Sequence, residues 1–255
     1  VGGGHYNNAM STYTTTGGGY DNWSSGTAAT VAAGGYNYVY APYSTAIGGG
    51  YNRVYGFASA VLGGQSNYVY AHWSVIGGHN SYIYAYGGTV GGGMYNSIYG
   101  YTGSVGGGKW NRMYNSWGHI GGGYYNWNYS PWSTMGGGTN HWMYGAAYLT
   151  TAGGHNHYQY AYAGSIGGGM YNTVYGYAGT ATSGYSAHAW GSWSVVGGGM
   201  WNWAFGTASV VGAGAYNWVS AEWGSINGGT YNKLYAPWSV IGGGQSNYIY
   251  SYASS

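Results

Sequence analysis

The sequence predicts an all-β protein built as a parallel β-solenoid, and three observations support this class. A glycine triplet, an asparagine and an apolar-tyrosine pair recur about every 15 residues, no long segment has the period of a helix, and glycine and aromatic residues are abundant. Disordered chains usually contain few aromatic residues and have no fixed period. A unit of this length is too short for a helical pair or a propeller blade, so it indicates one turn of a solenoid.

Asparagine marks the period. It occurs at Asn7, Asn22, Asn37, Asn52, Asn67, Asn96, Asn111, Asn126, Asn156, Asn172, Asn202, Asn217, Asn232 and Asn247. Degenerate copies fill the gaps, with Ser81, His141 and Ala187 at or near the expected place. We count about 17 coils of 15 residues and expect residues 1–255 to form a single solenoid array that is a piece of a longer chain.

Each unit follows the template Gly-Gly-Gly-x-x-Asn-x-apolar-Tyr-Gly-x-x-Ser-x-Val. The glycines predict the bend, because a positive φ costs glycine little and stacked turns approach closely there. Asparagine and the apolar residue two places later share one side of a first short strand, which we expect to face inward. Serine and the following Val or Ile predict a second short strand. The glycines do not indicate a phosphate loop, because no long helix follows them.

Asparagines at one place in successive turns predict a structural ladder in which each amide bonds the amide of the next turn. The candidate ladder residues are Asn22, Asn52, Asn96, Asn172, Asn202 and Asn247.

Charge and cysteine content exclude several functions. The chain has four Lys or Arg, two Asp or Glu and no Cys. No basic patch is available for phosphates, so we expect no nucleic-acid partner. Glycine and asparagine interrupt every apolar run, so we expect no transmembrane segment. Asp21 and Glu222 lie in different coils, so we predict no enzyme, no catalytic residue and no cofactor.

Histidine offers one weak metal candidate. The motif His155-Asn156-His157 places two imidazoles on one face of an extended strand, where three chains around an axis would bring them together. The alternative, which we favour, is a solvent-facing pair with no metal.

The template resembles the glycine-triplet repeats of trimeric autotransporter adhesin heads and of phage-tail-fibre-like bacterial surface proteins. Residues 17–31, Gly-Gly-Gly-Tyr-Asp-Asn-Trp-Ser-Ser-Gly-Thr-Ala-Ala-Thr-Val, are close to the pattern throughout. The resemblance implies a β-roll in each of three chains, a surface location and a structural or adhesive role. It carries no catalytic residues.

This chain departs from that pattern at one place, where apolar-Tyr replaces Ala-Ser. The predicted aromatic column comprises Tyr55, Tyr70, Tyr84, Tyr99, Tyr114, Tyr129, Tyr144, Tyr175, Phe205, Tyr235 and Tyr250. We favour a chain-to-chain seam for this column, because an exposed column would form a large apolar patch. A sugar-stacking or self-adhesive face is the alternative.

From these features we expect a structural or adhesive protein of the cell surface or extracellular space, a homotrimer that polymerises end to end or laterally. The alternative is a glycan- or surface-binding module. Its outward aromatic candidates include Trp127, Trp132, Trp201, Trp203 and Trp218.

Overall fold

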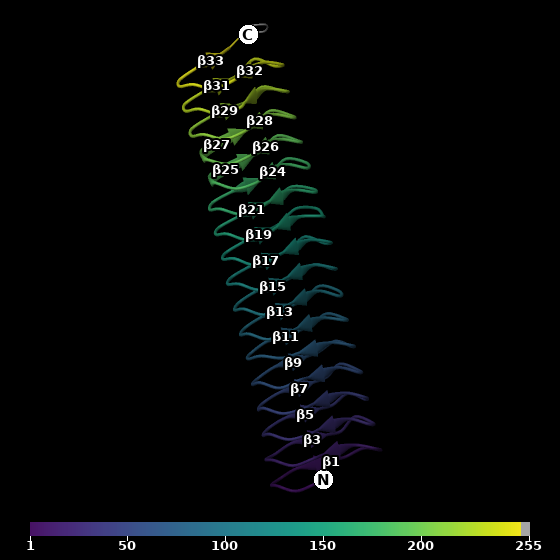
Figure 1. Cartoon of the computed structure of the whole chain (residues 1–255). Coiled ribbons are helices and arrows are strands. Elements are labelled where there is room, and N and C mark those ends of the chain that lie inside the picture. Colours follow the sequence, from purple (N-terminus) through teal and green to yellow (C-terminus); the bar gives the residue numbers. More distant parts are fainter. Residues whose placement is uncertain (251–255) are drawn as a thin grey trace. The chain divides into compact units, whose positions relative to one another are not determined.

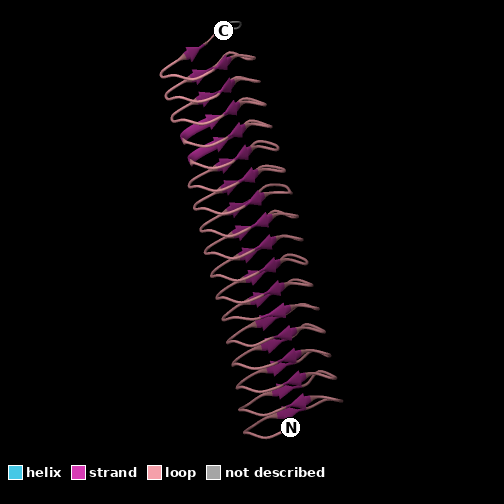
Figure 2. Cartoon of the chain, viewed as in Figure 1, coloured by secondary structure: helices cyan, strands magenta, loops and turns pink. Residues whose placement is uncertain are grey.

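The structure is a computed structural model that describes residues 1–250. These residues form short strands and loops without a helix, as Figure 2 shows. The predicted all-β, parallel solenoid is therefore confirmed. The chain divides into unit 1 (Val1–Asn126) and unit 2 (Trp127–Ser255). Across residues 1–250 no helix is long and apolar enough to span a bilayer.

Unit 1 contains strands β1 to β16. Odd-numbered strands form sheet A and even-numbered strands form sheet B. Their bounds are β1 Asn8–Ala9, β2 Thr15–Thr16, β3 Trp23–Ser24, β4 Thr30–Val31, β5 Tyr38–Val39, β6 Thr45–Ala46, β7 Arg53–Val54, β8 Ala60–Val61, β9 Tyr68–Val69, β10 Val75–Ile76, β11 Tyr82–Ile83, β12 Thr89–Val90, β13 Ser97–Ile98, β14 Ser104–Val105, β15 Arg112–Met113 and β16 His119–Ile120. Figure 1 shows these strands stacked turn upon turn, in purple to teal.

Unit 2 repeats this arrangement with odd strands in sheet A and even strands in sheet B. Their bounds are β17 Trp127–Asn128, β18 Thr134–Met135, β19 Trp142–Met143, β20 Thr150–Thr151, β21 Tyr158–Gln159, β22 Ser165–Ile166, β23 Thr173–Val174, β24 Thr180–Ala181, β25 Tyr185–Ala189, β26 Val195–Val196, β27 Met200–Ala204, β28 Val210–Val211, β29 Trp218–Val219, β30 Ser225–Ile226, β31 Lys233–Leu234, β32 Val240–Ile241 and β33 Tyr248–Ile249.

Strands pair in parallel with the strand one turn later in the same sheet. In sheet A, Tyr38 lies opposite Arg53, and in sheet B, Thr45 lies opposite Ala60. Turns differ slightly in length, and the difference lies in the corners. Residues at equivalent places in successive turns are usually 15 residues apart, but they are 14 apart at one turn and 16 apart at another. The register of the inward side chains survives these slips.

The core of each unit lies between its two sheets. In most strands the first residue faces outward and the second is buried, as alternation along a strand requires. Val54 of β7 and Val61 of β8, for example, are both 0% exposed. In most turns a buried asparagine lies two residues before the inward residue of the sheet A strand, and in several turns a buried serine takes the same place in sheet B.

At the corners, residues other than glycine also adopt the left-handed conformation. The third glycine of the triplet has a positive φ, as at Gly93 (82°), and this agrees with the expected bend. The residue before the asparagine is also left-handed and is often aromatic, as at Tyr51 (φ 59°). Its N–H donates to the previous turn, here to the Gly35 carbonyl at 3.0 Å, whereas the N–H of Arg53 donates forward to the Asn67 carbonyl.

Candidate functional site

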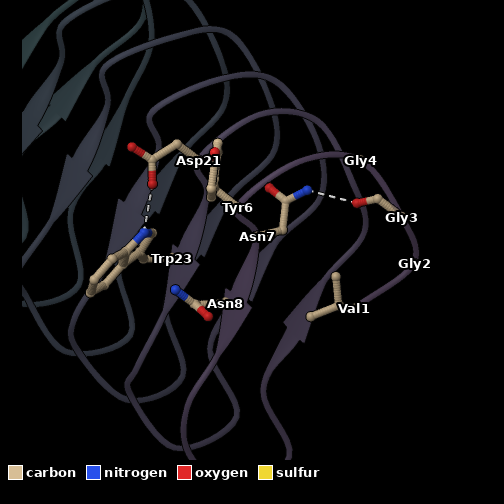
Figure 3. Close-up of a pocket in the computed structure, with 9 residues that line it drawn as sticks. All are labelled: Val1, Gly2, Gly3, Gly4, Tyr6, Asn7, Asn8, Asp21 and Trp23. Atoms are coloured by element: carbon tan, nitrogen blue, oxygen red, sulfur yellow. Dashed lines mark hydrogen bonds between the residues drawn. The ribbon is translucent and has the colours of Figure 1, made fainter.

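The buried asparagines bind the backbone of their own corner and of the neighbouring turns. Asn96 is 0% exposed, and its Nδ2 donates to the carbonyl oxygens of Gly92 (2.9 Å) and Gly108 (3.0 Å). Its Oδ1 accepts the N–H of Asn111 at 3.0 Å. Figure 3 shows the same geometry in the first turn, where the Asn7 amide donates to the Gly3 carbonyl at 2.6 Å.

The other candidate ladder residues lie in equivalent places. Asn22, Asn52, Asn172 and Asn202 are buried, and Asn247 is exposed. Direct amide-to-amide bonds, expected as the main link, occur between Asn52 and Asn37 (3.0 Å) and between Asn247 and Asn232 (3.1 Å). At the other ladder asparagines, as at Asn96, the hydrogen bonds join side chain to backbone.

Histidine replaces asparagine in two successive turns of unit 2. The N–H of His157 donates to Nδ1 of His141 at 3.3 Å, and the N–H of Asn172 donates to Nδ1 of His157 at 3.2 Å. The two imidazoles stack with centroids 4.7 Å apart. Burial, then the neighbouring histidines, lower the pKa of His141 to about 3, and burial lowers the pKa of His157 to about 4. Both rings are therefore neutral, as an accepting Nδ1 requires.

This arrangement corrects two details of the sequence interpretation. Asn156, expected to mark its turn, lies instead at the corner with a φ of 55°, and His157 occupies the ladder. Because Asn156 between them is left-handed, His155 and His157 do not lie together on one solvent-facing side of a strand as predicted. His157 is 1% exposed, whereas His155 is half-buried at the corner. No three His, Cys, Asp or Glu side chains among residues 1–250 cluster as metal ligands would.

A shorter serine ladder in sheet B was missing from the sequence prediction. Oγ of Ser44 accepts the N–H of Ser59 at 3.1 Å, and Oγ of Ser59 accepts the N–H of Ser74 at 3.1 Å. The hydroxyl of Ser59 also donates to the Ala71 carbonyl at 2.9 Å. The recurrence of serine at one place in the template was the signal that could have revealed it.

The predicted aromatic residues stack along the outside of each unit, directly after the sheet A strands. We call this set the tyrosine column. It comprises Tyr40, Tyr55, Tyr70, Tyr84, Tyr99 and Tyr114 in unit 1, and Tyr129, Tyr144, Tyr160, Tyr175, Trp190 and Phe205 in unit 2. In unit 1 the consecutive centroids are 4.8 to 5.2 Å apart, with planes within 6° of parallel. Tyr235 stacks on Tyr250 at 5.0 Å near the end of unit 2. Tyr40, Tyr160 and Trp190 extend the column beyond the residues predicted from sequence.

A second set of rings lies beside the first, on the outward residues of the sheet A strands. We call this the strand column. Tyr68 stacks on Tyr82 at 5.1 Å, and Tyr82 lies parallel to Tyr84 of the tyrosine column at 6.2 Å. The Arg53 guanidinium carbon takes the place of a ring, 5.7 Å from the Tyr38 centroid and 5.5 Å from that of Tyr68.

The stacking direction determines what these columns present to solvent. Rings that face one another along the stack cover each other's faces and expose their edges and hydroxyl groups. Tyr84 is 45% exposed although it stacks on both sides, at 4.9 Å with Tyr70 and at 5.0 Å with Tyr99. Ligands that need an uncovered ring face therefore find few sites along either column.

The outward tryptophans named from the sequence are also engaged with other rings. Trp127 stacks on Trp142 at 4.5 Å, and Trp203 lies 5.5 Å from Trp218. Trp132 stacks on Tyr148 at 5.7 Å and is 49% exposed. These contacts place the tryptophans within aromatic stacks on the outer surface.

The two acidic residues lie in separate units. In unit 1, Asp21 Oδ1 accepts the Trp23 indole N–H at 2.7 Å, and Oδ2 accepts the Tyr38 hydroxyl at 3.3 Å (Figure 3 shows the first bond). Glu222 belongs to unit 2. The Asp21 carboxylate is thus held by hydrogen bonds within the outer aromatic surface.

No protein-family model matches the chain, and a search of curated proteins also found no match.

Proposed function

We propose that the chain is a structural, non-catalytic protein that associates with copies of itself in an extracellular fibre, filament or adhesin head. The observation that carries the proposal is the tyrosine column, whose rings stack over many successive turns and are exposed on each unit. Tyr70 and Tyr99 are 43% and 44% exposed. Long exposed apolar strips of this kind are typical of interaction surfaces.

Low charge favours the same function. Six of the 255 residues carry a formal charge, so little electrostatic repulsion opposes the approach of two copies. Stacked rings are also ordered before association, which reduces the entropy cost of forming an interface. We propose a homotrimer with the tyrosine column at the contact between chains, and further growth end to end or sideways. The extracellular location follows the resemblance to adhesin heads.

A charge placed in the column tests this proposal. Tyr84→Glu puts a carboxylate between Tyr70 and Tyr99, where burial in an interface would leave the carboxylate without a partner. Thr89→Glu is the matched control, because Thr89 faces outward from sheet B. Sedimentation and electron microscopy should show discrete three-fold particles or filaments for the native chain and for Thr89→Glu, and dispersed single chains for Tyr84→Glu. A native chain that sediments as a monomer at every concentration would overturn the proposal.

Glycan binding is the second candidate function, and one observation favours it. The strand column is interrupted where Ser97 in unit 1 and Thr173 in unit 2 replace a large side chain. Ring faces turned toward these two places have no ring above them. Quenching of tryptophan fluorescence by polysaccharides would test this candidate independently of assembly.

A further inference from the structure

Two hollows open at the interruptions of the strand column, one in each unit. The hollow of about 410 Å³ in unit 2 is lined by Tyr158, Tyr171, Thr173, Tyr185, Ser186, His188 and Trp201. We call it the Thr173 notch. The hollow of about 220 Å³ in unit 1 is lined by Asn80, Tyr82, Tyr84, Tyr95, Ser97, Tyr99, Trp110 and Arg112. We call it the Ser97 notch. The small hydroxyl residue occupies the same place in the repeat in both.

The Thr173 notch has an aromatic wall on each side along the stack. Thr173 lies opposite Tyr158 of the preceding turn and opposite His188 of the following turn. Tyr158 has Trp142 on its far side at 6.3 Å, and His188 stacks on Trp203 at 5.7 Å with planes 9° apart. The near faces of Tyr158 and His188 therefore turn toward the level of Thr173. Two strand spacings place the backbones of Tyr158 and His188 about 9.6 Å apart, and Thr173 between them is 9% exposed.

This separation fits one inserted ring. Rings in the columns lie one turn apart, for example 5.1 Å between Tyr68 and Tyr82. A six-membered ring at the level of Thr173 would lie about 4.8 Å from each wall, within the range of favourable ring contacts. A pyranose chair is thicker than a flat aromatic ring and so fills this spacing more completely.

The side of the notch supplies further apolar surface. Tyr171 meets Tyr185 edge to face at 5.4 Å, and Tyr185 lies 5.8 Å from Trp201. These three rings hold one another in place, so the wall is already formed without a ligand. A preformed wall lowers the entropy cost of binding.

Polar groups at the notch match the hydroxyl groups of a sugar. The largely buried Thr173 and Ser186 place hydroxyls in the lining, and Nδ1 of His188 is buried without a hydrogen-bond partner among residues 1–250. Burial lowers the pKa of His188, so its imidazole is neutral at pH 7 and each nitrogen has one defined role. No acidic or basic side chain other than this histidine lines the notch, which favours an uncharged sugar.

Building on the glycan-binding candidate above, we propose that the Thr173 notch binds one pyranose ring of a neutral polysaccharide between Tyr158 and His188. The Ser97 notch binds a second ring between Tyr82 and the Arg112 side chain, which takes the place of the second aromatic wall. The inserted sugar takes the place of the missing member of the strand column. Because stacking covers most ring faces along the two columns, binding concentrates at these two places rather than spreading along the aromatic surface.

Filling the notches with a ring of the protein itself tests the proposal. The probes are cellohexaose, mannohexaose and chitohexaose, titrated by calorimetry into the native assembly. Thr173→Tyr restores the column and should remove one of two sites, and Ser97→Tyr with Thr173→Tyr should remove both. Thr173→Ala keeps the notch open and should weaken binding only about threefold, which corresponds to one hydrogen bond. Thr180→Tyr, which faces outward from sheet B, is the matched control and should bind like the native chain.

The outcomes are separable from those of the assembly experiment. Each variant is first checked for an unchanged melting temperature and for filament or trimer formation. Loss of binding in Thr173→Tyr with assembly retained supports the proposal. Absence of binding by all three probes, or equal binding by the native chain and the doubly filled variant, overturns it while leaving the structural function intact.

Discussion

The glycines of one triplet have different requirements although they are identical in sequence. A Cβ at Gly93 would lie 1.9 Å from the Gly108 carbonyl oxygen, and the φ of Gly93 is +82°. A Cβ at Gly92 would meet nothing within 4 Å. The close approach of stacked turns, rather than flexibility of the corner, therefore dictates glycine at the third place.

We predict that Gly93→Ala lowers the free energy of unfolding of unit 1 by about 3 kcal/mol or more, because both the clash and the positive φ oppose a side chain. Gly92→Ala should change it by less than about 0.5 kcal/mol. Urea denaturation followed by circular dichroism measures both. Equal effects at the two positions would contradict this account of the corner.

Histidines in the ladder should make unit 2 sensitive to acid. An unfolded histidine binds a proton below a pH of about 6.5, whereas folded His141 and His157 stay neutral down to about 3 and about 4. The unfolded state then binds more protons, so stability falls as the pH is lowered from 6.5 toward 4. The limiting slope is about 1.4 kcal/mol per pH unit for each residue.

The variant His141→Asn/His157→Asn should lose most of this slope, because asparagine already fills the same place in other turns. The lowered pKa of His188 leaves a smaller acid dependence. Thermal melting between pH 7 and pH 4 measures the difference, with His155→Asn as the control. A double variant as acid-sensitive as the native chain would show that other groups control the response.

At the scale of a whole element, the asparagine ladder joins each turn to its neighbours through buried groups. Asn96→Ala would leave the carbonyls of Gly92 and Gly108 and the N–H of Asn111 without this side chain. We predict a loss of about 3 kcal/mol, since each unsatisfied buried group costs about 1–3 kcal/mol. Chemical denaturation measures it. The exposed Asn8→Ala is the control, and a loss below 1 kcal/mol at Asn96 would refute the structural role.

The tyrosine column should make the protein sensitive to alkali. Burial, followed by repulsion from Tyr70 and Tyr99 when ionised, raises the pKa of Tyr84 above 10.0. Burial likewise raises the pKa of Tyr160. Above pH 10 the unfolded chain releases these protons first, so the folded state binds more protons and stability falls as the pH rises. Spectrophotometric titration at 295 nm should show delayed ionisation that becomes normal after unfolding; a normal titration of the folded chain would contradict it.

At the scale of the whole molecule, association should depend little on salt. Ions do not screen contacts between aromatic surfaces, and the chain carries few charged residues whose interactions salt could screen. We predict that assembly, measured by sedimentation, is unchanged or slightly stronger when NaCl is raised from 50 mM to 1 M. Disassembly at high salt would show that the few charged residues hold the copies together.

Much of the fold was predictable because each turn repeats the same requirements. Period, bends and the inward asparagine all follow from spacing and from glycine. Left-handed aromatic residues such as Tyr51 were not predictable, because bulky side chains seldom adopt that conformation. In the structure the conformation goes with the N–H of Tyr51 donating to the Gly35 carbonyl of the previous turn rather than to the next turn. The sequence analysis placed Asn156 in the ladder instead of His157, because the turn between His141 and His157 has 16 residues rather than 15.

The candidate site was less predictable than the fold. Ser97 and Thr173 look like ordinary outward strand residues in the sequence, and their importance depends on the large side chains above and below them. Only the parallel register, which aligns Thr173 with Tyr158 and His188, reveals that one ring is missing from the stack.

The 14- and 16-residue turns described above have a consequence for how such a gene can change. Since the corners tolerate one residue more or less while the hydrogen bonds of the ladder stay aligned, recombination between unequal copies need not be accurate to the codon. Duplication or deletion of a turn would join two surfaces that already match. A lineage could therefore alter the number of turns in small heritable steps. Such steps would also change how many turns lie before and after the interruptions at Ser97 and Thr173.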